Sequence, residues 1–145
     1  MFTRKYNVHH PPVFFGDTID PVEEVYSHCH LGLTLQSNCT WSDHIQNIYK
    51  KACERLNMLR MFKYKMDRSS LIQIYLSFIR PVLEYGDVVW DNCSQQNSDL
   101  LESVQIEAAR IITGLRRNSS KSNLYTELGI EPLSERRQKH KLILF

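Results

Sequence analysis

The sequence feature that most constrains the fold is a series of apolar residues at helical spacing that extends, with short interruptions, from residue 40 to residue 114. In its first part, apolar residues recur every three or four positions, as they do on one face of an amphipathic α-helix. These positions are Ile45, Ile48, Tyr49, Ala52, Leu56 and Leu59. Thr40 and Asp43 precede them in a capping-box-like arrangement, so we expect a helix from there to about residue 64.

Two more helices are expected before residue 114. Asp67 and the polar residues after it restart a helix, whose apolar positions continue at helical spacing to Val82. A third helix begins near residues 94–98, and Gly114 is placed to end it as a C-terminal cap. Because short connections favour antiparallel neighbours, residues 40–114 predict a bundle of three helices.

The connection between the second and third helices lies in residues 75–93, YLSFIRPVLEYGDVVWDNC. Pro81 lacks an N–H group and crowds the carbonyl four residues earlier, so either the helix kinks or one helix ends near Ile79 and another begins. We expect Arg80 to leave helical geometry, Gly86 to adopt a positive φ, and the valine-rich segment that follows to form a short buried connection. The aromatic side chains expected in the core are Trp41, Tyr75, Tyr85 and Trp90.

A small β unit is expected before the bundle. Residues 1–12 read as an extended segment. Residues 13–36 offer three strand candidates, which are VFF at 13–15, TIDPVEEV at 18–25 and HLGLTL at 30–35. So small an antiparallel sheet needs another surface to pack on.

Residues 115–145 predict a C-terminal helical extension. A short helix over residues 122–128 is stopped by Gly129, and Pro132 opens a last helix, because proline is well tolerated at the first helical position. That helix still runs at Phe145, from which we expect a truncated piece of a longer protein. The expected fold class is mainly α, with a small N-terminal antiparallel β unit followed by a three-helix bundle and two further helices.

Basic residues are concentrated in two clusters, although the net charge is only +2. The first cluster surrounds one acidic residue, Glu54, and consists of Lys50, Lys51, Arg55, Arg60, Lys63 and Lys65. The second cluster consists of Arg136, Arg137, Lys139 and Lys141. Local positive patches of this kind attract polyanions even when the whole chain is nearly neutral.

Several classes of protein are disfavoured. The N-terminus carries charge but no apolar run of the signal-peptide type, and no segment reaches the roughly 18 consecutive apolar residues of a membrane span. The four cysteines form no C-x-x-C pair. We therefore expect an intracellular protein, nuclear or cytoplasmic, with reduced thiols, no membrane partner and no small-molecule substrate.

No catalytic or metal-binding constellation is expected. One candidate zinc site combines the run His-Cys-His at 28–30 with Cys39, but its spacing matches no common zinc module. Alternation along a strand also turns Cys29 away from His28 and His30, so we interpret the histidines as exposed strand residues. The adjacent acids Glu23-Glu24 read as a solvated segment. The sequence contains neither a G-x-S-x-G nucleophile motif nor a Gly-rich phosphate loop.

The segment RPVLEYGDVVW resembles a signature of the region downstream of the polymerase core in non-LTR (LINE-type) retrotransposon reverse transcriptases. Before it, HLGLTL resembles the Leu-Gly strand of the primer-grip hairpin at the edge of the palm, TWSDHI the opening of the first thumb helix, and KACERLNMLR the basic helix that follows. After it, LLESVQIEAARIITG and LGIEPLSERR resemble two later helices of the same region. The resemblance covers the chain from about residue 3 to its end.

The resemblance implies that residues 13–36 are a primer-grip-like β unit at the palm edge and that residues 40–114 are a thumb-like bundle. Its implied partners are an RNA–DNA or DNA template–primer duplex and the missing palm and fingers of the parent polymerase. The residues expected to contact nucleic acid are Leu31 and Gly32 at the primer grip and Lys51, Arg55 and Lys65 on one flank of the first helix. Contacts of this kind position a duplex backbone without reading its sequence.

The same resemblance implies that this chain does not polymerise DNA by itself. Nucleotidyl transfer needs carboxylates that hold two metal ions, and enzymes of this family carry an adjacent pair of aspartates, which this sequence lacks. We therefore expect no cofactor in this chain, since Mg²⁺ would be bound by the missing palm. Three alternatives stay open: the basic flank is only a solvated face, the chain is a stand-alone helical protein-interaction module derived from a transposon remnant, or it is a non-functional translated remnant.

Overall fold

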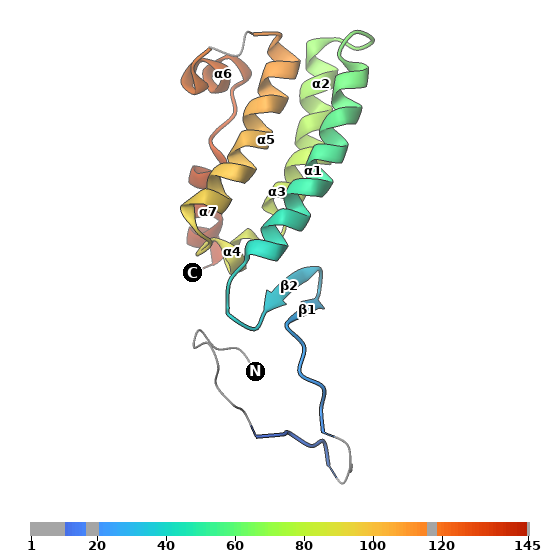
Figure 1. The fold of residues 1–145 in the computed structure, drawn as a ribbon. Helices are drawn as coiled ribbons and strands as arrows, with labels where there is room; N and C mark the ends of the chain where they lie inside the picture. The colour runs from blue at the N-terminus through green and yellow to red at the C-terminus, as the bar shows by residue number, and fades with distance from the viewer. Residues whose placement is uncertain (1–10, 17–20, 116–118, 145) are drawn as a thin grey trace. The chain divides into compact units, whose positions relative to one another are not determined.

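The computed structural model describes residues 11–16, 21–115 and 119–144 (Figure 1). The protein is mainly helical, with a two-stranded antiparallel sheet near the N-terminus followed by helices, so the expected fold class is confirmed. The chain divides into two compact units, Met1–His44 and Ile45–Phe145. Most of the extended segment expected over residues 1–12 lies outside the described residues.

The first unit contains a β-hairpin. Its strands, β1 (Ser27–His30) and β2 (Leu33–Gln36), pair in antiparallel fashion. The two loop residues, Leu31 and Gly32, have φ values of 48° and 78°, and positive values at both positions are typical of a two-residue hairpin turn. The expected single strand over residues 30–35 is therefore wrong, because glycine at the second loop position allows the chain to reverse there.

The other two expected strands are reduced to one backbone bridge, between Phe14 and Pro21. Next to it, the Val22 N–H donates to the carbonyl oxygen of Val13 at 2.7 Å. Proline has no N–H to add to a ladder, and among the described residues this pairing extends no further. Residues 18–20, which begin the expected strand 18–25, lie outside the described part of the chain.

Helix α1 (Ser42–Phe62) begins and ends close to the expected positions. The Asp43 N–H and the Thr40 hydroxyl both donate to Gln36 Oε1, at 3.1 and 3.0 Å. Gln36 therefore takes the capping role that the sequence suggested for Thr40, because the hairpin brings its amide to the start of the helix. The buried apolar side chains of α1 are Ile45, Ile48, Ala52, Leu56 and Leu59, all from the predicted face.

The second expected helix passes through Pro81 without a break. It consists of α2 (Arg68–Ile74), a π-helical segment η1 (Tyr75–Ile79) and α3 (Arg80–Glu84). In η1 the Arg80 N–H donates to the carbonyl of Tyr75, five residues earlier, and the wider turn accommodates a proline that would crowd an ordinary α-helix. The prediction that Arg80 leaves helical geometry is wrong, since its φ and ψ are −57° and −40°.

The turn after α3 follows the prediction at its glycine and departs from it elsewhere. Gly86 has φ of 64°, as expected, and starts the single helical turn α4 (Asp87–Trp90). Val89 is 53% exposed, so this connection is not fully buried. Tyr85 is 56% exposed, against the prediction, because its backbone carbonyl rather than its ring packs inward and accepts the Trp90 Nε1–H at 2.8 Å.

Tyr75 and Trp90 do lie in the core, with exposures of 1% and 0%, while Trp41 is half-buried.

The remaining helices end and begin at the predicted residues. They are α5 (Gln95–Thr113), α6 (Lys121–Leu128) and α7 (Leu133–Leu144). Gly114 and Gly129 adopt left-handed conformations after α5 and α6. Helix α5 contacts α2, α6 and α7, and so forms the centre of the second unit (Figure 1). Phe145, where the last helix was expected to continue, lies outside the described residues.

Across residues 11–16, 21–115 and 119–144, none of the helices has the length and apolar character needed to cross a membrane.

Candidate nucleic-acid interface

The first basic cluster lies on α1 and the turn after it. Lys50 and Lys51 are exposed on α1, and Lys65 is exposed just beyond its end. Within the part of the chain that the structure describes, none of these three lysines forms an ion pair. Their charges are therefore available to an external polyanion.

Arg55, by contrast, is engaged inside the second unit. Its Nη1 donates to the carbonyl oxygen of Phe78 in η1, and its guanidinium lies 4.3 Å from the centroid of the Phe78 ring. Arg55 thus links α1 to the π-helical segment through a hydrogen bond and a cation–π contact. The contact of Arg55 with Phe78 was not predicted from the sequence.

Arg60, also of the first cluster, links α1 to α5. Its Nη2 lies 3.0 Å from Glu107 Oε1, and its Nη1 donates to Asn57 Oδ1 at 2.7 Å. Glu107 also lies 3.7 Å from Arg110 on its own helix. Exposed pairs of this kind contribute little to stability, so they mainly fix where the side chains lie.

Leu31 and Gly32 form the tip of the hairpin in the first unit, where the Leu31 side chain is 77% exposed. Lys51, Arg55 and Lys65 lie in the second unit. The five predicted site residues therefore form two groups, one within each unit.

The two histidines of β1 lie on one face of the hairpin, as predicted. The His28 and His30 rings are stacked with centroids 6.4 Å apart, and both residues are exposed. Cys29, between them, is paired in register with Thr34. Over the described residues, no group of three or more potential ligands is arranged to hold a metal ion.

The second basic cluster is neutralised within the chain, so its interpretation as an open polyanion-binding patch is not supported. Its ion pairs are Arg136–Glu84, Arg137–Asp91, Lys139–Glu131 and Lys141–Asp91. The acidic partners of this cluster were not identified from the sequence. Glu84, Asp87 and Asp91 are spaced by three and four residues, which is the helical spacing that would have indicated an acidic face.

Asp91 makes the contact of α7 with the residue after α4 sensitive to acid, because it pairs with Arg137 and Lys141. Burial alone would raise the pKa of Asp91, but hydrogen bonds from Lys141 and Arg137 outweigh burial and hold the pKa below its usual value. A carboxylate with a lowered pKa stabilises the fold at pH values above the pKa of the unfolded chain, and this contribution is lost as the pH falls through the folded pKa.

We therefore expect the free energy of unfolding to fall below about pH 4, and to fall less steeply in an Asp91→Asn variant. Urea denaturation between about pH 2 and 6 measures both curves. The N-cap Asp67 also has a lowered pKa and contributes equally to both proteins, so the difference between the curves reports Asp91. Parallel curves would show that Asp91 has no such role.

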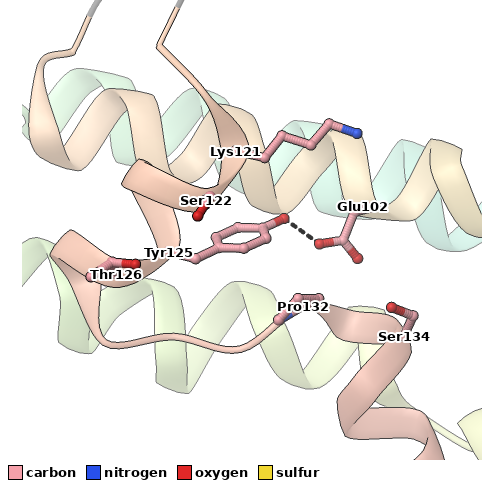
Figure 2. A pocket seen from close by; sticks show the side chains of 7 residues that line it. All are labelled: Glu102, Lys121, Ser122, Tyr125, Thr126, Pro132 and Ser134. Carbon is pink, nitrogen blue, oxygen red and sulfur yellow. Dashed lines mark hydrogen bonds between the residues drawn. The ribbon is translucent and has the colours of Figure 1, made fainter.

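A polar network holds α6 and the start of α7 against α5. Glu102 accepts the Tyr125 hydroxyl through Oε1 (Figure 2). It also accepts the Leu133 N–H through Oε2 at 3.0 Å. Burial and the bond to Glu102 raise the pKa of the Tyr125 hydroxyl. Gln105, one turn further along α5, accepts the Tyr75 hydroxyl and donates to the carbonyl of Glu131. The Glu and Gln of the LESVQ segment are thus explained by internal hydrogen bonds.

Beside this network lies a pocket of about 460 Å³. Figure 2 shows its lining, which consists of Glu102, Lys121, Ser122, Tyr125, Thr126, Pro132 and Ser134. Its carboxylate is already satisfied by the Tyr125 hydroxyl and the Leu133 N–H. We therefore interpret the pocket as a consequence of the packing of α6 and α7 against α5, and not as a preformed catalytic centre.

Comparison with known proteins gives two distant relatives. The chain is 23% identical over 133 residues to "Probable RNA-directed DNA polymerase from transposon X-element" of Drosophila melanogaster, a match that covers 90% of this chain and 14% of the relative. It is 23% identical over 114 residues to "Probable RNA-directed DNA polymerase from transposon BS" of the same organism, covering 77% of this chain and 13% of the relative.

The chain therefore spans about one seventh of the length of these relatives. No family model and no solved structure matches it. The two similarities support a region related to a reverse transcriptase.

Proposed function

We propose that the chain is the primer-grip and thumb region of a non-LTR retrotransposon reverse transcriptase. In this proposal residues 13–36 belong to the palm edge, residues 40–114 form the thumb, and residues 115–145 extend it. The similarity to two transposon RNA-directed DNA polymerases over most of the chain supports the proposal. The segments that resemble this family follow one another in the family's order, from HLGLTL to LGIEPLSERR, and this order supports the assignment to the primer grip and thumb.

In this function α1 binds the backbone of a template–primer duplex. The observation that carries the proposal is the exposure of Lys51 and Lys65, which have no internal ion pair among the described residues, whereas the second basic cluster is neutralised. Arg55 contributes indirectly, by holding Phe78 beside the same face. Leu31 and Gly32 approach the primer end. Mg²⁺ and the catalytic carboxylates come from the palm of the parent polymerase.

The test is the salt dependence of binding to a fluorescently labelled RNA–DNA hybrid, followed by anisotropy between about 50 and 200 mM salt. Each lysine that neutralises one phosphate contributes about one unit to the slope of log affinity against log salt. We expect Lys51→Glu and Lys65→Glu each to weaken binding at low salt and to make the slope shallower by about one unit.

Lys121→Glu is the matched control, because it makes the same change of charge at an exposed position on α6, away from α1. This variant should keep the slope of the parent chain. Equal losses in all three variants would show that only net charge matters, and the α1 interface would then be wrong. The helical circular dichroism of each variant shows that it is folded.

A second candidate function is a protein-interaction module. It is favoured by the exposed apolar side chains near the end of α1, since Met58, Met61 and Tyr64 are 45%, 70% and 89% exposed. Large exposed apolar side chains that lie close together mark interaction sites in many proteins. If the folded chain binds no hybrid up to about 50 µM, this surface becomes the leading candidate.

A further inference from the structure

Helix α7 is held on the second unit mainly by charge. Among its described side chains, only Leu133 and Arg137 are buried. Leu142 and Ile143 are 80% and 81% exposed. Helix α5, by contrast, buries nine side chains. A helix that buries so little apolar surface gains little hydrophobic free energy from docking.

The contacts that replace apolar packing are ion pairs with α3 and with the residue after α4, together with a hydrogen bond to α4. The ion pairs are Arg136–Glu84, Arg137–Asp91 and Lys141–Asp91. In the hydrogen bond, His140 Nδ1 lies 2.6 Å from Asp87 Oδ2. A further pair, Lys139–Glu131, joins the middle of α7 to the segment just before the helix. The acids are more deeply buried than most of their partners, since the side chains of Asp87 and Asp91 are 5% and 10% exposed.

Arg137 is the centre of this contact. Its Nε lies 2.8 Å from Asp91 Oδ1, its Nη2 donates to the hydroxyl of Ser98, and its guanidinium lies 5.7 Å from the centroid of the Trp90 ring. Its Nη1 is buried and has no hydrogen-bond partner among the described residues. A buried guanidinium with one unsatisfied nitrogen is stabilised less than a fully bonded one.

Release of α7 does not leave every acid without a partner. Glu84 also lies 3.8 Å from Arg80 on its own helix and keeps that cation when Arg136 departs. Asp87 and Asp91 become hydrated once the helix that covers them moves away, so their charges need no protein partner in the open state. The cost of opening is therefore small compared with the cost of breaking an ion pair that stays buried.

We propose that α7 is an ion-paired latch, opened by the phosphate backbone of a nucleic-acid duplex that competes with Glu84 and Asp91 for the cations of the helix. Arginine forms strong, charge-assisted hydrogen bonds with phosphate, and a duplex offers a dense row of such groups. In the open state the second basic cluster adds to the basic surface of α1. The proposal rests on the proposed function for the identity of the polyanion, and on the ion pairs for the mechanism.

Hydrogen exchange of the full chain, with and without a saturating RNA–DNA hybrid, tests the latch. We expect the amides of α7 to exchange at least about tenfold faster when the hybrid is bound, while the amides of α5 keep their protection. A Trp41→Phe background leaves Trp90 as the remaining tryptophan, and its emission should shift to longer wavelength as Arg137 and α7 leave it. A chain whose α7 amides keep or gain protection on binding has no such latch.

Two carboxylate-to-amide variants sharpen the test. Asp91→Asn removes the charge that holds both Arg137 and Lys141, so α7 should exchange faster even without hybrid. Asp99→Asn is the matched control, because Asp99 is exposed on α5 and bonds only to Gln95 in the described structure. Equal exchange of α7 in the two variants would overturn the latch without any nucleic acid in the experiment.

The outcomes separate this proposal from the proposed function. Hybrid that binds without opening α7 overturns the latch and leaves the α1 interface standing. Hybrid that opens α7 equally well in Lys51→Glu and Lys65→Glu variants supports the latch and overturns the α1 interface. If no hybrid binds and Asp91→Asn leaves α7 as protected as Asp99→Asn does, both proposals fail.

Discussion

Replacing Trp90 by alanine is expected to lower the free energy of unfolding by about 3–5 kcal/mol. The indole is completely buried and is the largest of the fully buried side chains that the structure describes. Alanine would leave a cavity beneath Arg137 and would also leave the carbonyl of Tyr85 without the Nε1–H that it accepts. Chemical denaturation followed by circular dichroism measures the loss as a lower midpoint at an unchanged slope.

Val89→Ala is the matched control, because Val89 lies on the same helical turn and is 53% exposed. It should change the free energy of unfolding by no more than about 0.5 kcal/mol. A Trp90→Phe variant keeps most of the volume and loses the hydrogen bond, so it should fall between the two. Similar losses at positions 89 and 90 would contradict the assignment of Trp90 to the core.

The helix ends are the part of the fold that the sequence predicts best. Asp67 accepts the N–H groups of Ser69 and Ser70, and Gly114 and Gly129 take the left-handed conformations that end α5 and α6. Each of these signals acts within a few residues of itself, so the sequence pattern contains the whole interaction. The apolar face of α1 was predictable for the same reason.

The errors arose where the backbone had more than one local solution. At Leu31 and Gly32 the pattern fitted a strand, but two positive φ values turned it into a hairpin loop. At Pro81 the pattern predicted a kink or a break, whereas the five-residue hydrogen-bond spacing of η1 lets the helix continue. Neither solution has a strong sequence signal, since an isolated glycine or proline is compatible with several backbone geometries.

Counting charges along the sequence does not predict which basic side chains are neutralised within the fold. Arg55 and Lys51 belong to one basic cluster in the sequence, yet Arg55 bonds to a carbonyl 23 residues away while Lys51 stays exposed. Arg137 meets Asp91 across 46 residues. Which cations are neutralised depends on pairings between distant segments, and composition contains no information about those pairings. Internal contacts therefore distinguish Arg55 from Lys51 within one basic cluster of the sequence.

The second large effect is expected at Gln105. Replacing this glutamine by leucine should lower the free energy of unfolding by about 2–4 kcal/mol, because the buried Tyr75 hydroxyl and the partly buried carbonyl of Glu131 each lose a partner. Gln105 is 0% exposed, its Oε1 accepts the Tyr75 hydroxyl, and its Nε2 donates to the carbonyl of Glu131 at 2.9 Å. Gln95→Leu, at an exposed position of the same helix, is the control and should have little effect.

A double-mutant cycle with Tyr75→Phe separates the hydrogen bond from the shape of the side chain. In the Gln105→Leu variant the Tyr75 hydroxyl is left buried without its acceptor, since Tyr75 is only 1% exposed. Removing that hydroxyl as well should recover about 1 kcal/mol, because two apolar groups cost less than one unsatisfied polar group. Strictly additive losses would mean that the two side chains do not depend on each other, and that Gln105 acts mainly through Glu131, where the segment before α7 meets α5.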